Sequence, residues 1–263
     1  MSTQVWKKIM SLQNITTTAI AGLPVCAINP AAASTAVCEA AAQHEPADIH
    51  LANAFVVSLA HQDERYHELL AQSAAIFPDG KPLTWASRIK RGSNLSQVRG
   101  PSLFENVISE GRATGLRHFF LGNTPETLGL LTAELERRYP GMIVAGSYSP
   151  PFRALSQAEL AAQDDLIRET RPDIVWVGLG TPKQDAEARR VAEELGLVAI
   201  AIGAAFDFIA GTKKEAPEIL STLGLEWVFR FASEPRRLWR RYLIGNLVFS
   251  WAVLKPRAKR VAA

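Results

Sequence analysis

Asp173-Ile-Val-Trp-Val-Gly178 and Leu197-Val-Ala-Ile-Ala-Ile-Gly203 are short, almost purely apolar runs, and residues 184–195 between them have a helical pattern. Strands that are buried on both faces are apolar at nearly every position, as in parallel sheets whose strands are connected by helices. This strand–helix–strand stretch therefore predicts a parallel sheet that is covered by helices on both faces.

Similar patterns recur along the chain. A second helical pattern covers residues 126–139, and further apolar runs occupy 49–52, 75–77, 117–122 and 142–146. The alternation predicts an α/β fold, namely a Rossmann-like, doubly wound, mainly parallel sheet over residues 20–230. We expect residues 1–19 to form an N-terminal extension and residues 231–263 a basic, amphipathic helical appendage.

The composition is that of a globular protein with a full core: 263 residues, 48% apolar and 21% charged. The sequence holds no apolar run of 18 residues and no N-terminal signal-peptide pattern, so we expect a cytoplasmic protein without a membrane span. Its two cysteines and five histidines have no redox or metal-ligand spacing. These residues therefore predict neither a redox motif nor a metal site.

The C-terminal segment carries most of the positive charge. Between residues 230 and 260 there are nine basic residues and one acid, Glu234, whereas the whole chain has a net charge of only +3. If Ser233 caps a helix, the two sides of that helix differ. Leu238, Trp239, Tyr242 and Leu243 fall on one side, and Arg236, Arg237, Arg240 and Arg241 on the other.

This division has two interpretations. The segment lies on an anionic membrane surface, or it docks on the domain or on another subunit of a homo-oligomer. Its tryptophans and leucines favour either interpretation over nucleic-acid binding.

Two strand-to-helix turns share one design, with glycine followed by Thr-Pro at Thr124-Pro125 and at Thr181-Pro182. Threonine suits the N-cap of a helix and proline its first position. Such turns lie at the carboxyl ends of parallel strands, where ligands bind. The spacing of Thr181 and Gln184 also fits a capping box, in which Gln184 satisfies only a backbone N–H.

Two acidic residues are candidates for chemistry. Phe77-Pro-Asp79-Gly-Lys81 is an ordinary turn sequence, and it also places Asp79 at the end of a strand, where it can act as a general base. Asp207 lies between Phe206 and Phe208, and a carboxylate in apolar surroundings needs a polar partner or a functional role. A structural hydrogen bond and a ligand contact both remain open.

Several ordered motifs resemble one family, and they cover roughly residues 48 to 246. The motifs are His50-Leu-Ala-Asn53, Phe77-Pro-Asp-Gly80, Val98-Arg-Gly-Pro101, Phe120-Leu-Gly-Asn-Thr-Pro125, Tyr148-Ser-Pro-Pro-Phe152, Pro172 to Gln184, Gly203 to Gly211, Ala216-Pro217, and Gly224-Leu-Glu-Trp227 through Asn246. As an ordered series they resemble the WecG/TagA/CpsF glycosyltransferases, glycosyltransferase family twenty-six.

The resemblance implies transfer of a sugar from a UDP-sugar to a polyprenyl-diphosphate-linked sugar at the inner face of the cell membrane. It implies inversion at the donor carbon and neither an essential metal nor another cofactor, with Asp79 as general base and Gln184 in the active site. We expect substrate contacts at Asn53, Gly80, Arg99, Gly100, Gly122, Asn123, Gly178, Gly180, Thr181, Pro182, Lys183 and Asp207. We expect the acceptor and membrane contacts at Arg236, Arg237, Trp239, Arg240 and Arg241.

Three positions depart from some members of the family. This chain has Leu51, Gln97 and Ser102 where those members have threonine, arginine and an acid. The donor sugar therefore stays open, between N-acetylmannosamine, its uronic acid and neutral hexoses. Two rival functions also stay open: a nucleotide-dependent oxidoreductase, although its third fingerprint glycine is missing, and a non-catalytic membrane-docking scaffold.

Overall fold

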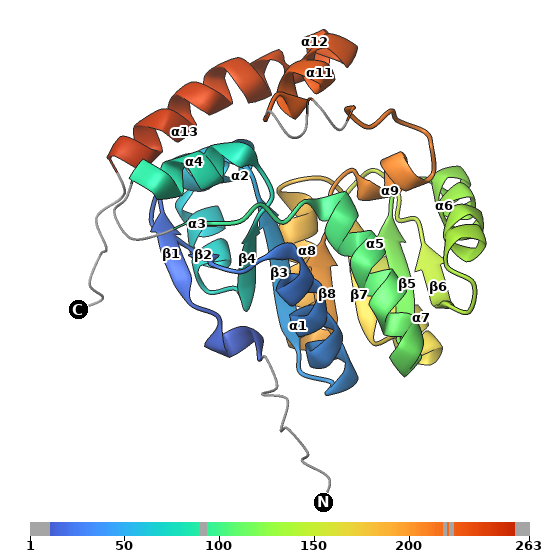
Figure 1. The fold of residues 1–263 in the computed structure, drawn as a ribbon. Helices are drawn as coiled ribbons and strands as arrows, with labels where there is room; N and C mark the ends of the chain where they lie inside the picture. The colour runs from blue at the N-terminus through green and yellow to red at the C-terminus, as the bar shows by residue number, and fades with distance from the viewer. Residues whose placement is uncertain (1–10, 90–93, 218–219, 221–223, 256–263) are drawn as a thin grey trace, which may run out of the picture.

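The computed structural model describes residues 11–89, 94–217, 220 and 224–255. Its centre is a six-stranded parallel sheet with the order β4-β3-β8-β7-β5-β6 (Figure 1). The strands are β3 (Ala47–Ala52), β4 (Ala75–Pro78), β5 (Arg117–Gly122), β6 (Ile143–Tyr148), β7 (Ile174–Gly178) and β8 (Val198–Ala201). The predicted doubly wound α/β fold is confirmed, and each apolar run of the sequence overlaps one of these strands.

Helices cover both faces of the sheet. They are α1 (Pro30–Ala42), α2 (Ala54–Gln62), α3 (Glu64–Ala71), α4 (Lys81–Ile89), α5 (Gly100–Gly111), α6 (Pro125–Arg138), α7 (Gln157–Thr170), α8 (Lys183–Leu195) and α9 (Ala205–Ile209). Short 3₁₀ turns lie at Leu12–Asn14 and Arg112–Thr114. α1 and α5 pack on one face, and α7 and α8 on the other (Figure 1).

Alternate side chains of β7 and β8 fill two separate core clusters. Trp176 and Ile200 point toward α1 and α5. Val175 and Val177, which flank Trp176 in β7, point toward α7 and α8. Phe104 of α5 meets the Trp176 ring edge-on, with ring centroids 4.5 Å apart. A strand that is buried on both faces needs apolar residues at successive positions, which explains why these runs lack the polar alternation of a half-exposed strand.

An N-terminal hairpin is present that the sequence pattern did not predict. β1 (Thr17–Ile20) pairs antiparallel with β2 (Leu23–Cys26). The turn residues Ala21 and Gly22 both have positive φ, at 50° and 93°, as a tight two-residue hairpin requires. The expected domain boundary at residue 20 falls at the last residue of β1.

The C-terminal residues form α11 (Glu226–Ser233), α12 (Pro235–Trp239), a π-helical turn (Arg240–Ile244) and α13 (Gly245–Leu254). They lie over the carboxyl ends of the strands, and α13 packs against α2 (Figure 1). Phe249 and Ala252 of α13 are buried in the cluster that α2 shares with the hairpin. No helix within the described ranges is long and apolar enough to span a membrane.

Two expectations about this segment were wrong. Ser233 ends α11 and does not cap the next helix, whose N-cap residue is Glu234. Leu238 and Tyr242 are buried, but Trp239 and Leu243 are exposed, so the four do not share one side. The reason is the helical period: successive residues are rotated by about 100°, so Leu238 and Tyr242 share one side of the helix, and Trp239 and Leu243 share the next.

Candidate active site

A cavity of about 1150 Å³ lies at the carboxyl ends of the strands. Its wall includes residues that follow β3, β4, β7 and β8, and residues of α11 and the π-helical turn close it from the other side. The chain leaves neighbouring strands β5 and β7 in opposite directions, toward β6 and toward β8. Ligands bind at such points of divergence in open parallel sheets.

The cavity brings together most of the predicted catalytic and substrate-binding residues. Those in its wall are Asn53, Asp79, Gly100, Asn123, Gly178, Gly180, Thr181, Lys183, Gln184 and Asp207. Gly80 lines an adjoining pocket of about 80 Å³, which shares Asn53 and Asp79 with the main cavity. Arg99, Gly122 and Pro182 are not in either wall, although each is next in sequence to a residue of the main wall.

Asp79 is held by the backbone on both sides of the turn that carries it. Its N–H donates to the Ala52 carbonyl at 2.8 Å, and its Oδ1 accepts the Gly100 N–H at 2.9 Å. Gln97 donates its side-chain amide to the Asp79 carbonyl at 2.6 Å. Gly100 begins α5, so the carboxylate lies at a helix N-terminus, where negative charge is favoured. The turn is therefore both structural and directed at the cavity.

The groups around Asp79 shift its pKa in opposite directions. Burial, together with the Glu226 carboxylate, raises the pKa of Asp79 above its ordinary value. The Gly100 N–H and the guanidinium groups of Arg230 and Arg99 lower this pKa without cancelling the rise. A carboxylate with a raised pKa is a stronger base than an exposed one, as a general base requires.

Gln184 closes the turn between β7 and α8. Its Oε1 accepts the Gly180 N–H at 3.0 Å, and its Nε2 lies 3.5 Å from the Thr181 Oγ1. The capping interpretation is thus partly confirmed, because Gln184 does satisfy a backbone N–H. The predicted Thr-Pro helix start is wrong here, since α8 begins at Lys183 and the Thr181 hydroxyl contacts a side chain instead of a backbone N–H.

Other predicted residues also have structural partners. Thr124 caps α6 with Pro125 in its first turn, as expected. Asn53 Oδ1 accepts the N–H groups of Phe55 and Val56, which leaves its amide Nδ2 as the group that can donate to a ligand. Asp207 of α9 pairs with Lys213 at 3.0 Å, so its expected partner lies in the segment that follows α9.

Sequence reasoning missed two charged residues of the C-terminal helices. Arg230 lines the main cavity and pairs with Glu226 at 2.7 Å, and Glu226 also lies 3.5 Å from Arg99. Two sequence signals were present: both residues lie within the motif from Gly224 through Asn246, and they have an i,i+4 spacing, which by itself indicates an ordinary surface pair. In the fold, this pair brings α11 to the turn that carries Asp79.

The predicted acceptor and membrane residues separate into two groups. Arg241 lines both pockets and stacks on the Phe55 ring, with 4.4 Å from its guanidinium carbon to the ring centroid. Arg236, Trp239 and Arg240 are exposed and lie outside the cavity wall. The Arg237 side chain is outside the described part of the structure.

Comparison with known proteins identifies the family. Residues 18–263 match the glycosyl transferase WecG/TagA/CpsF family. The chain belongs to this family. It is therefore a glycosyltransferase, and the resemblance seen in the sequence motifs is confirmed.

Three relatives carry the same name, N-acetylglucosaminyldiphosphoundecaprenol N-acetyl-beta-D-mannosaminyltransferase. The protein of Bacillus spizizenii is 31% identical over 202 residues, which cover 76% of each chain. That of Bacillus subtilis is 28% identical over 74% of each chain. That of Staphylococcus aureus is 26% identical over 80% of this chain and 81% of its own. These names describe transferases that act on a lipid-linked sugar.

Proposed function

We propose that this glycosyltransferase moves an N-acetylmannosamine-type sugar or a hexose from a UDP-sugar to a polyprenyl-diphosphate-linked sugar. The product would serve the synthesis of a cell-wall polymer or exopolysaccharide. The observation that carries the proposal is the position of Asp79, a backbone-anchored carboxylate in the wall of a cavity large enough for a nucleotide sugar. The names of the relatives support the acceptor class.

In the proposed reaction, an acceptor hydroxyl oxygen attacks the anomeric carbon of the donor. The bond from that carbon to the β-phosphate oxygen breaks, UDP leaves with the electron pair, and Asp79 takes the hydroxyl proton. Attack on the face opposite to UDP inverts the configuration of the sugar. Lys183, Lys214 and Arg241 line the same cavity, and their positive charges would balance the charge that develops on the diphosphate. We expect no metal in this step.

The rival oxidoreductase function can be separated by ligand-induced stabilisation. We expect UDP to raise the melting temperature by several degrees and NAD to leave it unchanged. A ligand at about 100 times its Kd adds about 2.7 kcal/mol to the free energy of unfolding, which a thermal shift detects easily. Stabilisation by NAD but not by UDP would contradict the proposal.

The C-terminal helices also offer a surface for the membrane that holds the acceptor. Trp239, Leu243, Leu247, Trp251 and Leu254 are exposed on successive turns of this segment. Arg240 stacks on Trp239 and Lys255 on Trp251, so cations flank the apolar groups. Apolar side chains bordered by cations suit the boundary between anionic headgroups and acyl chains. We propose that this face binds the inner surface of the cell membrane peripherally.

Replacing both Leu247 and Trp251 with glutamate is expected to weaken binding to phosphatidylglycerol-containing vesicles by more than about tenfold. The two side chains are 74% and 54% exposed, so the substitution removes apolar contact and adds repulsion without disturbing the core. UDP-induced stabilisation should not change. Vesicle co-sedimentation measures the effect.

Leu130→Glu is the matched control, because Leu130 is an exposed leucine on α6, away from this segment. The control should bind vesicles like the unmodified protein. If the double variant keeps its vesicle binding but becomes a smaller species in sedimentation velocity, the face is a contact between subunits and the membrane proposal is wrong.

A further inference from the structure

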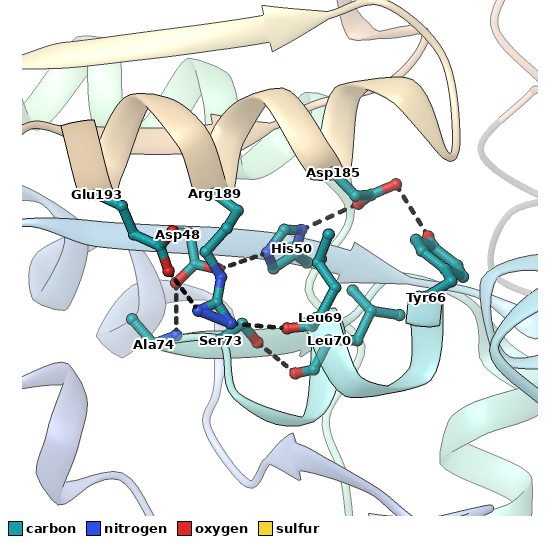
Figure 2. A network of polar contacts seen from close by, with 10 residues as sticks. All are labelled: Asp48, His50, Tyr66, Leu69, Leu70, Ser73, Ala74, Asp185, Arg189 and Glu193. Carbon is teal, nitrogen blue, oxygen red and sulfur yellow. Dashed lines mark hydrogen bonds and ion pairs between the residues drawn. The ribbon is translucent and has the colours of Figure 1, made fainter. Parts of the chain in front are cut away.

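His50 lies in the middle of β3, fully buried between two carboxylates. Its Nδ1 is 3.0 Å from Asp185 Oδ1, and its Nε2 is 3.0 Å from Asp48 Oδ2 (Figure 2). Asp185 belongs to the first turn of α8, and Asp48 to β3 itself. The imidazole thus joins the sheet to the helix that begins at the cavity.

Both carboxylates have further partners (Figure 2). The Tyr66 hydroxyl donates to Asp185 Oδ2 at 2.9 Å, and the Ala74 N–H donates to Asp48 Oδ1 at 2.9 Å. Arg189 of α8 lies 3.0 Å from Asp48 and also pairs with Glu193 at 2.9 Å. β3, α3 and α8 therefore meet in one network of polar and charged groups, which is buried around His50 and reaches the surface at Glu193.

The geometry favours a protonated imidazole. Carboxylates only accept hydrogen bonds, and a neutral imidazole has one N–H, so only imidazolium donates to Asp185 and Asp48 together. Burial alone would lower the pKa of His50, but the hydrogen bonds and charges of Asp185 and Asp48 outweigh burial and raise it. Tyr66, Arg189 and Glu193 are the other titratable groups of the network.

A second buried histidine of the same sheet behaves differently. His118 of β5 accepts a hydrogen bond at Nδ1 from the Trp176 indole N–H at 3.1 Å. Burial lowers the pKa of His118 to about 4, so this imidazole is neutral. The charged state of His50 is therefore a consequence of its two carboxylates and not of burial in the sheet.

The network adjoins the candidate active site in two places, at the start of α8 and just after the end of β3. Asp185 directly follows Gln184, whose Oε1 holds the Gly180 N–H. Three residues after His50, Asn53 lies in the cavity wall. A shift of α8 relative to β3 would therefore move Gln184 and the Gly178–Lys183 turn relative to Asn53.

We propose that His50 is a positioning residue for sugar transfer. By donating to Asp48 and Asp185 at once, it holds the first turn of α8 against β3 and thereby sets Gln184 and the Gly178–Lys183 turn in the cavity wall. That this wall binds a UDP-sugar rests on the proposed function, whereas the effect of His50 on the turn does not.

The test is the His50→Gln variant, measured without ligand and with UDP. A glutamine amide cannot donate to two carboxylates on opposite sides, so one anchor is lost. The protection factor of the Gly180 amide in hydrogen exchange should fall by about tenfold or more, the size of one charge-assisted hydrogen bond. The Kd for UDP should rise by a similar factor.

His118→Gln is the matched control, since it also removes a buried imidazole with one hydrogen bond from the sheet. It should reduce global stability but leave the Gly180 protection, relative to the global value, and the Kd for UDP unchanged. If His50→Gln does not fold, Asp185→Asn tests the same anchor, because the amide keeps the size of the carboxylate and removes its charge.

The pH dependence gives a signature that a purely structural role would not produce. The folded-state pKa of His50 lies above its unfolded value of about 6.5. Below a pH of about 6.5, His50 is protonated and holds both carboxylates. This anchor is lost as pH rises through the folded-state pKa of His50. The hydrogen-exchange protection factor of the Gly180 amide should therefore fall over this pH range in the unmodified protein and should not change in His50→Gln.

Unchanged Gly180 protection in folded His50→Gln and Asp185→Asn would overturn the inference. Failure of the unmodified protein to bind UDP would count against the proposed function alone, because the exchange measurement still decides the role of His50.

Discussion

Replacing Asp79 with asparagine is expected to lower turnover by about 10²- to 10⁴-fold, the usual contribution of a general base. Asparagine retains an Oδ1 that can accept the Gly100 N–H, so the turn at the end of β4 keeps its geometry. It cannot take a proton from the acceptor hydroxyl. The Kd for UDP should therefore stay close to that of the unmodified protein, and the loss should appear in kcat.

The same variant should not be less stable at pH 7. Because the pKa of Asp79 is raised in the folded protein, its ionised form opposes folding at neutral pH, and asparagine removes that charge. In the unmodified protein, activity should fall as pH drops through this pKa, which lies above the ordinary value of about 4. Urea unfolding and a pH–rate profile measure both effects.

Asp165→Asn serves as control for this prediction, since Asp165 is an exposed carboxylate on α7 that pairs only with Arg168 among the interactions described. It should retain full turnover. Near-full turnover in Asp79→Asn would instead remove Asp79 from the chemical step.

Replacing Gly122 with alanine is expected to lower the free energy of unfolding by about 2 to 6 kcal/mol. The backbone at Gly122 has φ near +122°, and a Cβ there would lie 2.6 Å from the carbonyl carbon and oxygen of Gly178 on the neighbouring strand. Strain at such a φ costs about 1 to 3 kcal/mol, and displacing packed atoms costs about as much again. Chemical denaturation measures the change.

Gly178 cannot simply move away from the new methyl group. A Cβ built on Gly178 itself would lie 2.7 Å from the Phe206 ring, so the β7 turn is already packed against the core. The displaced turn belongs to the cavity wall, and UDP binding should weaken with stability. Gly141→Ala separates the two causes, because Gly141 also has positive φ, at 86°, but its Cβ would meet nothing within 4 Å. An equal loss in both variants would contradict the close-contact explanation.

The sheet could be predicted because its strands are buried on both faces, which leaves continuous apolar runs such as residues 174–177. The β1–β2 hairpin could not, since each strand has only four residues and its turn depends on positive φ at Ala21, a residue without turn preference. The π-helical turn was also hidden, because no residue type at 240–244 signals an extra residue per turn.

Much of the candidate site followed from the same reasoning, since parallel strands bring their carboxyl ends to one edge. Asp79, Gly178 and Gln184 could be placed together for that reason, although they are far apart in sequence. Arg230 and Glu226 could not, because they reach the site only when the C-terminal helices fold back over the sheet. The role of His50 could not be predicted either, because Asp185 reaches it only in the folded chain.

Sugar transfer itself is the most direct measurement. A panel of UDP-sugars that includes UDP-N-acetylmannosamine would be assayed with N-acetylglucosaminyl-diphosphoundecaprenol, using the unmodified protein and Asp79→Asn. We expect one UDP-sugar to give a lipid-linked disaccharide with inverted anomeric configuration, and the variant to form it at least about 100-fold more slowly. No product from any UDP-sugar, or equal rates with both proteins, would contradict the proposed function and its mechanism.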